Sequence, residues 1–112
     1  MARLRLRVDL APGHSLGPGK VGLLEGIAET GSISAAARRL GMSYRRAWML
    51  LDALGQTFAE PLVETSVGGR EGGGARLTPF GAEIVSRFRA MEKEAEAALS
   101  PHLAAFARAR RD

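Results

Sequence analysis

The hydrophobic pattern changes its period along the chain, and these changes predict where strands and helices lie. Aliphatic side chains at positions 4, 6, 8 and 10 alternate with charged ones at 3, 5, 7 and 9. A period of two is typical of a strand with one buried face. The other face carries Arg3, Arg5 and Arg7, which we expect to be solvated and to discourage edge pairing. Residues 11–19 contain two prolines and three glycines, which predict a loop.

A helical spacing follows over residues 18–30. The apolar face of this predicted helix consists of Val21, Leu24, Ile27 and Ala28. Gly22 and Gly26 lie inside it, and each lowers helix stability by up to about 1 kcal/mol. We therefore expect the helix to be held mainly by packing against later helices.

Residues 32–56 predict two short helices joined by a tight turn. Ser32 is a good N-cap for the first helix, and Gly41 can adopt the positive φ that ends it. Ser43 then caps a second helix that begins at Tyr44. Apolar residues stand where a helix-turn-helix needs them between its helices, at Ala36, Leu40, Met42, Ala47 and Leu50. Further along this helix, we expect Trp48, Leu51, Leu54 and Phe58 to share its inner face, with Trp48 in the core or at a subunit contact.

Two short β-prone runs flank a glycine-rich stretch at residues 62–77, which predicts a β-hairpin. Thr78-Pro79 is a strong helix start, and the helix is predicted to run to about Leu99. Ser100-Pro101 is expected to end it and to begin a last short helix. The long helix has more apolar stripe than a small body needs, so we expect it to pair with the same helix of a second subunit. The residues assigned to that contact are Ile84, Phe88, Met91 and Ala95.

Together these elements predict a mainly α protein with a small β wing: a winged helix-turn-helix with an N-terminal strand and a long C-terminal helix. Residues 1–78 form the winged part, with the helix-turn-helix at 32–56 and the wing at 62–77. Residues 79–112 add the long dimerisation helix and a short terminal helix to the same domain. A chain of 112 residues suits one domain.

Composition narrows the function. The chain has 46% hydrophobic and 25% charged residues and a net charge of +4. No apolar run approaches the roughly 20 residues of a membrane span, so no membrane partner is expected. The chain contains no cysteine, which excludes disulfides and thiolate metal sites. Its two histidines and its carboxylates form no catalytic or metal-binding pattern, so we expect neither an enzyme nor a cofactor.

Charge points to double-stranded DNA as the partner. Residues 31–51 contain four arginines and no acidic residue. The first turn of the second helix carries Ser43, Tyr44, Arg45 and Arg46, where a recognition helix (43–54) meets base edges. Phosphates are assigned to Arg38, Arg39, Arg70 and Arg76. The N-terminal arginines are not expected to contact DNA. The alternative is an ordinary helical hairpin with a solvated basic face, in a protein-interaction or architectural module that dimerises through its C-terminal helix and has little DNA specificity.

The sequence resembles the N-terminal DNA-binding domain of the ModE family of molybdate-responsive transcriptional regulators, and more distantly that of LysR-type regulators. The resemblance rests on LLEGIAETGSISAAARRLGMSYRRAW (23–48), LVETSVGGREGGGARLTPFG (62–81) and the long helix that follows. It implies a homodimer that binds operator DNA. Because the N-terminus alternates and forms no apolar signal core, we expect the protein in the cytoplasm, beside the nucleoid. It also places Ser34 and Ala35 near phosphate, and Gly69, Arg70 and Gly72 in the wing. Family members carry further β-barrel domains for molybdate. The present sequence ends after helices, so we do not expect it to bind molybdate or another oxyanion.

Overall fold

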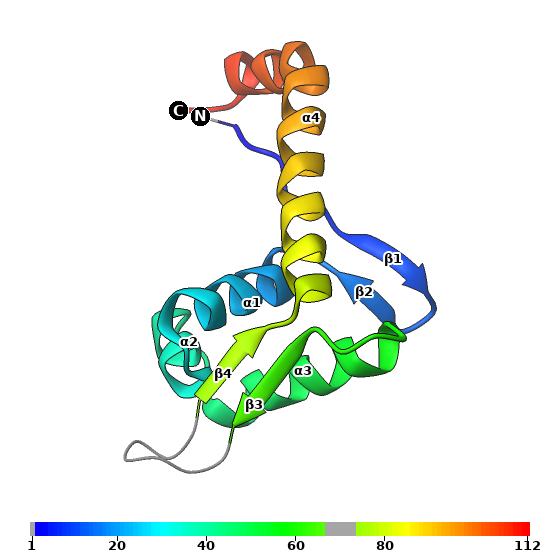
Figure 1. The fold of residues 1–112 in the computed structure, drawn as a ribbon. Coiled ribbons are helices and arrows are strands. Elements are labelled where there is room, and N and C mark those ends of the chain that lie inside the picture. The colour runs from blue at the N-terminus through cyan, green and yellow to red at the C-terminus, as the bar shows by residue number, and fades with distance from the viewer. Residues whose placement is uncertain (1, 67–73) are drawn as a thin grey trace.

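The computed structural model describes residues 2–66 and 74–112 (Figure 1). The elements in chain order are β1 (Val8–Ala11), β2 (His14–Leu16), α1 (Pro18–Thr30), α2 (Ile33–Arg39), α3 (Tyr44–Thr57), β3 (Val63–Ser66), β4 (Gly74–Leu77) and α4 (Pro79–Ala109). Helices α1, α2 and α3 form the body, with the β3–β4 hairpin along one side. Helix α4 rises from this body, and its far end extends well beyond it (Figure 1).

The N-terminal segment forms a hairpin where the sequence predicted one strand and a loop. β1 pairs antiparallel with β2, with Val8 opposite Leu16 and Asp9 opposite Ser15. The loop assigned to residues 11–19 is therefore wrong in part, because His14–Leu16 is a strand. The strand was not predicted because His14 and Ser15 are polar and Leu16 is its one buried aliphatic residue. The predicted strand is also shorter than expected, and Leu10 is 51% exposed.

Helix α1 lies at the centre of the body and touches both other helices and α4. Its predicted span is confirmed, but its buried face includes Leu23 and leaves Ala28 exposed. Gly26 faces α2 so closely that a Cβ there would lie 2.9 Å from Cβ of Ala36. The glycine that weakens the isolated helix thus permits the approach of the next one.

The helix-turn-helix forms as the sequence predicts, and its caps are confirmed. The Ser32 hydroxyl accepts a hydrogen bond from the amide of Ala35 at 3.1 Å. Gly41 has φ +69°, the left-handed conformation that ends α2. The Ser43 hydroxyl accepts from the amide of Arg46 at 3.0 Å, which fixes the start of α3.

Two groups of buried side chains form the core. The first joins α1, α2, α3 and β4 through Leu23, Ile27, Ile33, Ala36, Ala37, Ala47 and Ala75. The second joins β2, α1, α3, α4 and the residue before β3 through Leu16, Val21, Leu24, Leu54, Leu62 and Phe88. Three partly buried side chains, Leu51, Val63 and Leu77, contact both groups. The body is therefore one continuous packed unit.

The predicted wing strands are confirmed as β3 and β4, which pair antiparallel from Val63 opposite Leu77 to Ser66 opposite Gly74. Backbone hydrogen bonds fix this hairpin to the body. The amide of Ala75 donates to the carbonyl of Gly31 at 2.9 Å, and that of Thr78 donates to the carbonyl of Leu62 at 2.9 Å. The wing is thus placed beside the start of the helix-turn-helix.

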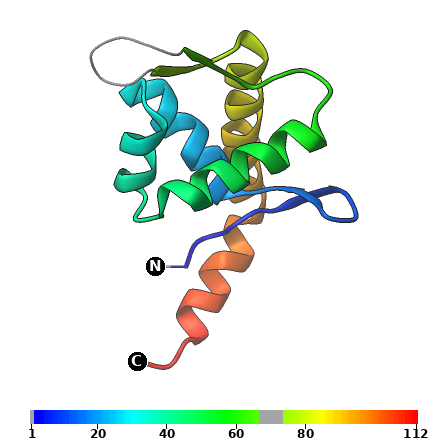
Figure 2. The same cartoon turned by 90° about the horizontal axis from the view of Figure 1, so that it is seen from below.

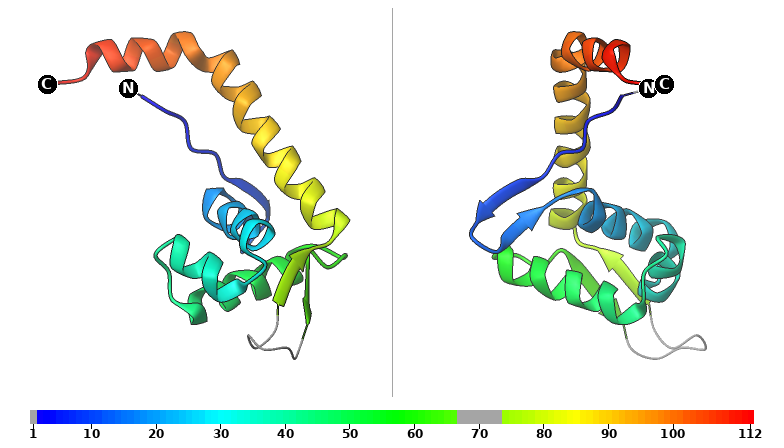
Figure 3. Two further views of the ribbon diagram at one scale, coloured as in Figure 1. Left: turned by 60° about the vertical axis from the view of Figure 1, so that its left-hand side comes forward. Right: turned by 180° about the vertical axis from the view of Figure 1, so that it is seen from behind.

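Helix α4 begins as predicted, with Pro79 in its first turn and the Thr78 hydroxyl accepting from the amide of Gly81 at 2.9 Å. It does not end at Leu99. One helix continues to Ala109 with Pro101 inside it, and it bends near that proline (Figure 3). The separate short C-terminal helix is therefore wrong: the proline bends the helix and does not terminate it.

The lower half of α4 packs on its own body. Phe88 is 1% exposed, and Ile84 packs against the same core group. This corrects the assignment of Phe88 to a subunit contact, because its apolar surface is buried within its own body. Ile84 is only half-buried, so its assignment to the contact stays a prediction. The Arg89 guanidinium donates to both carboxylate oxygens of Glu25 on α1, at 2.5 and 2.9 Å, and to Glu92 at 2.7 Å. These hydrogen bonds, first those with Glu25, raise the pKa of Arg89 above its ordinary value.

Candidate nucleic-acid interface

Most side chains in the first two turns of α3 are exposed. Tyr44 is 54% exposed, Met49 is 61% exposed, and Arg45 and Arg46 are also exposed, whereas Ala47 is fully buried. Successive residues of a helix are about 100° apart. Arg45 and Met49 therefore point away from the core, opposite Ala47 and the buried Leu54. Tyr44 and Arg46 lie on the two flanks of that outward face.

The two flanks of α3 have different neighbours. Viewed from below, the helix crosses the molecule with the β3–β4 strands along one side and the β1–β2 hairpin along the other (Figure 2). The wing flank carries Tyr44 and Trp48, whose rings meet edge to face with centroids 6.2 Å apart. Arg46 is on the opposite flank, where it lines a groove with residues of the N-terminal segment. The sequence grouped Tyr44, Arg45 and Arg46 as one turn, and the structure separates their directions.

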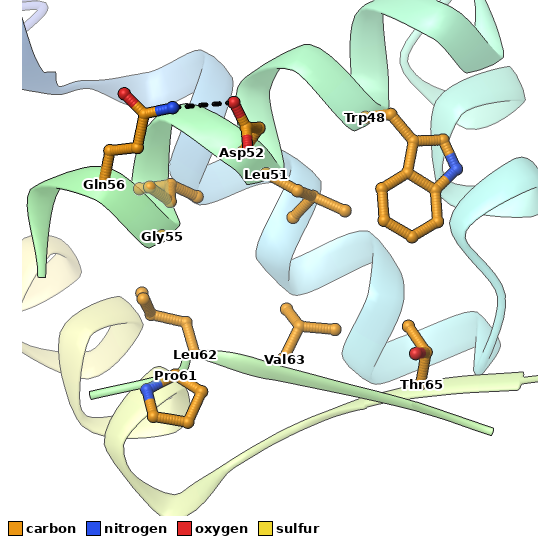
Figure 4. Close-up of a pocket in the computed structure, with 10 residues that line it drawn as sticks. Trp48, Leu51, Asp52, Gly55, Gln56, Pro61, Leu62, Val63 and Thr65 are labelled. Carbon is orange, nitrogen blue, oxygen red and sulfur yellow. Dashed lines mark hydrogen bonds between the residues drawn. The ribbon is translucent and has the colours of Figure 1, made fainter. Parts of the chain in front are cut away.

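An apolar groove of about 470 Å³ separates α3 from β3 (Figure 4). Trp48 and Leu51 line it from the helix, and Leu62, Val63 and Thr65 line it from the wing side. Trp48 is 42% exposed, so its expected position on the inner face with Leu54 is wrong. Along α3, Ala47 is buried and Leu50 and Leu51 are half-buried, whereas Trp48 lies on the open side of this stripe.

Beyond these turns the outward face of α3 loses its cationic character. Asp52 is exposed there and accepts a hydrogen bond from the Gln56 amide at 2.9 Å (Figure 4). The cationic part of α3 is thus confined to its N-terminal half. Met49 is the residue of this face that sequence reasoning missed. Its position four residues after Arg45 is the signal that would have found it.

The predicted phosphate contacts on α2 fall in two places. Ser34 and Ala35 are half-buried at the start of the helix, with the Ser34 hydroxyl 3.1 Å from that of Ser32. Arg38 and Arg39 are exposed in its last turn. Arg39 donates to Glu29 at 2.5 Å, an exposed pair that costs little to open.

The wing contributes Arg76, an exposed residue that donates two hydrogen bonds to one Glu64 oxygen at 2.9 and 3.1 Å. The predicted wing residues Gly69, Arg70 and Gly72 lie outside the described residues. Within the described ranges, Arg38, Arg45 and Arg46 have no carboxylate within 4 Å. Their charge is therefore available to a polyanion.

Residues 2–66 and 74–112 contain no group of side chains suited to a metal ion and no membrane-spanning helix. No three histidine, aspartate or glutamate side chains come together there as metal ligands. His14 lies in β2, and its Nδ1 is 2.9 Å from the Thr57 hydroxyl at the end of α3. No helix in these ranges is long and apolar enough to cross a membrane.

Comparison with known proteins agrees with this geometry. Residues 20–82 match the family described as bacterial regulatory helix-turn-helix protein, lysR family. The molybdenum transport protein ModE of Azotobacter vinelandii is 41% identical over 99 residues, which cover 88% of this chain and 36% of that protein. The molybdenum-pterin-binding protein MopB of Rhodobacter capsulatus is 45% identical over 80 residues, covering 71% and 30%. The DNA-binding transcriptional dual regulator ModE of Escherichia coli K12 is 39% identical over 71 residues, covering 63% and 27%.

Two solved structures share the fold. A chain from the crystal structure of a CbnR_DBD–DNA complex superposes with a TM-score of 0.60 at 24% identity, covering 78% of this chain and 94% of that one. ArgP from Mycobacterium tuberculosis gives 0.51 at 26% identity, covering 74% and 30%. The chain spans about a third of the length of the curated relatives named above.

The fold and the exposed helix α3 define the class of the protein, which is a winged helix-turn-helix of the DNA-binding transcriptional regulators. Proteins of this class are not enzymes. The chain belongs to the lysR family of bacterial regulatory helix-turn-helix proteins, and it is similar in sequence to about a third of ModE from Azotobacter vinelandii.

Proposed function

We propose that the protein binds operator DNA sequence-specifically as a homodimer, with the first turns of α3 in the major groove. This proposal depends on the exposed, outward-facing Arg45, which lies beside Tyr44 and Arg46. No carboxylate of the described residues forms an ion pair with it. An arginine so placed can donate two hydrogen bonds to guanine, the commonest specific base contact. The wing lies along one flank of the same helix, where Arg76 reaches solvent.

Dimerisation is proposed through the upper half of α4. Met91 and Leu99 are 44% and 40% exposed on the stripe that continues beyond the core residue Phe88. Two copies joined there would present two α3 helices, and paired recognition helices read half-sites about one DNA turn apart. The bacterial relatives support action on DNA in the cytoplasm. The names of the relatives mention molybdenum, so the experiment below also measures whether molybdate changes binding.

The test begins with selection of preferred duplexes from a random pool, with and without added molybdate. Affinity for the selected and a scrambled duplex is then measured by fluorescence polarisation for Arg45→Ala, Arg46→Ala and Arg39→Ala. We expect Arg45→Ala and Arg46→Ala to lose about 5- to 150-fold on the selected duplex, the worth of one base contact, and much less on the scrambled one.

Arg39→Ala is the matched control, because it removes the same charge from α2. It should weaken both duplexes about equally, through loss of a phosphate contact. Equal loss on both duplexes for all three variants would contradict a base-reading role for α3. The same pattern, together with a shallow dependence on salt, would favour the alternative of an architectural or protein-interaction module.

A further inference from the structure

A second groove lies on the flank of α3 opposite the wing. Three segments line it: residues 5–7, Ser15 together with residues 17–20 at the start of α1, and Met42, Arg46 and Leu50 of the helix-turn-helix. Four of its lining side chains are basic, and none is acidic. We call it the basic groove, after Arg5, Arg7, Lys20 and Arg46.

The cations of the basic groove are only partly neutralised. Arg7 donates to Asp9 at 2.9 Å, an exposed pair. The Lys20 ammonium donates one hydrogen bond, to the carbonyl of Ser15 at 2.7 Å, and this bond leaves two of its N–H groups and its full charge. Arg5 and Arg46 have no carboxylate within 4 Å in the described residues. An anion entering the groove would therefore meet several uncompensated positive charges.

The position of the groove matches the shape of a duplex. The major groove of DNA is about 12 Å wide, so an inserted helix has a phosphate backbone on each side of it. The wing flanks α3 on one side, and the N-terminal hairpin flanks it on the other (Figure 2). Arg46 belongs to the same helical turn as Arg45. With this turn in the major groove, the wing and the N-terminal hairpin could therefore contact the duplex at the same time.

We propose that Arg5 and Lys20, in the basic groove, bind neighbouring backbone phosphates of the same duplex, on the strand opposite the wing. This inference rests on the proposed function and extends the interface to the N-terminal segment and to Lys20. The alternating sequence favoured a solvated edge for Arg5 and Arg7. Their position beside α3 became visible only in the folded chain.

The test measures the salt dependence of binding to the selected duplex for Arg5→Ala, Lys20→Ala and the double variant. Each phosphate contact adds about 0.9 to the slope of log K against log [salt]. We expect each single variant to make the slope shallower by about 1 and the double variant by about 2. Lys20→Arg, which keeps the charge, should restore the wild-type slope.

Arg3→Ala is the matched control on the same segment. Arg3 is exposed two residues from Arg5, but it lines a different groove with Glu92 and Glu96 of α4. Arg5 also borders that groove. Arg3→Ala should leave the slope unchanged, and melting followed by circular dichroism checks that every variant is folded.

Phosphate ethylation interference gives an independent measurement. We expect at least one phosphate whose modification blocks the wild type and has no effect on the double variant. Slopes equal to that of the wild type in folded Arg5→Ala and Lys20→Ala, with specific binding intact, would overturn the role of the groove alone. A wild-type protein that binds no duplex would instead overturn the proposed function.

Discussion

At the scale of single residues, short-range chemistry explains much of the structure. The caps formed by Ser32, Ser43 and Thr78 each satisfy an amide three residues later in the chain. Glycines are less uniform, because some end helices and others permit contact between segments. Gly81 shows the second use, since a Cβ there would lie 2.2 Å from the carbonyl oxygen of Leu62. The same residue type at Gly22 faces only Leu40, at 3.7 Å.

Gly26 and Gly22 give a matched pair of substitutions in α1. Gly26→Ala should lower the free energy of unfolding, because its Cβ would meet Ala36 at 2.9 Å. Overpacking costs about 1–3 kcal/mol, more than the roughly 1 kcal/mol gained in helix propensity. Gly22→Ala should raise stability by up to about 1 kcal/mol, because nothing opposes the same gain. Urea unfolding measures both, and equal effects would contradict the close approach of α1 and α2.

At the scale of elements, α4 changes its role along its length. Its first three turns pack on the body through Phe88, and the ion pair of Arg89 with Glu25 joins it to α1. Beyond Met91 most of its side chains are exposed. Pro101 lies in this outer half, where it removes one backbone hydrogen bond and bends the helix (Figure 3).

Substitution of Pro101, with Pro79 as the control, tests the origin of this bend. Pro101→Ala should straighten the outer half of α4, because it restores an N–H donor and removes a ring clash worth about 3 kcal/mol. We expect higher helicity by far-UV circular dichroism and slower amide exchange over residues 98–105. Pro79→Ala should change helicity little, since Pro79 lies in the first turn, where amides have no helical partner. Unchanged exchange in the Pro101 variant would show that another feature sets the bend.

At the scale of the whole molecule, the shape is more extended than a single compact body. The radius of gyration is 16.4 Å, against about 13 Å expected for a globular chain of this length. The outer half of α4 accounts for this excess, and it exposes Met91, Leu99 and Phe106 at 44%, 40% and 70%. A row of apolar side chains on a projecting helix is what a symmetric helix pair requires.

Sedimentation velocity tests this dimer. We expect Met91→Glu and Leu99→Glu to shift the protein toward monomer, because each places a charge on the apolar stripe. Ala97→Glu adds the same charge on the exposed opposite face of the helix and should leave association unchanged. A wild type that remains monomeric at tens of micromolar would contradict dimerisation through α4.

The sequence by itself determined the elements that depend on neighbours in the chain. Caps, glycine stops, hydrophobic period and the acid-free arginine segment are local signals, so the helix-turn-helix and the wing strands could be predicted from them. β2 was missed because two of its three residues are polar, and its strand is made by pairing with β1.

Only the tertiary structure decided which surfaces remain free. Phe88 and Met91 belong to one stripe in the sequence, yet the body covers the first and leaves the second exposed. Arg45 and Arg46 are adjacent in the chain and face different sides of α3. The N-terminal Arg5 and Arg7 lie beside that helix only because packing brings them there. Contacts between distant segments depend on the complementary shapes of folded elements, and no local pattern of residues encodes them.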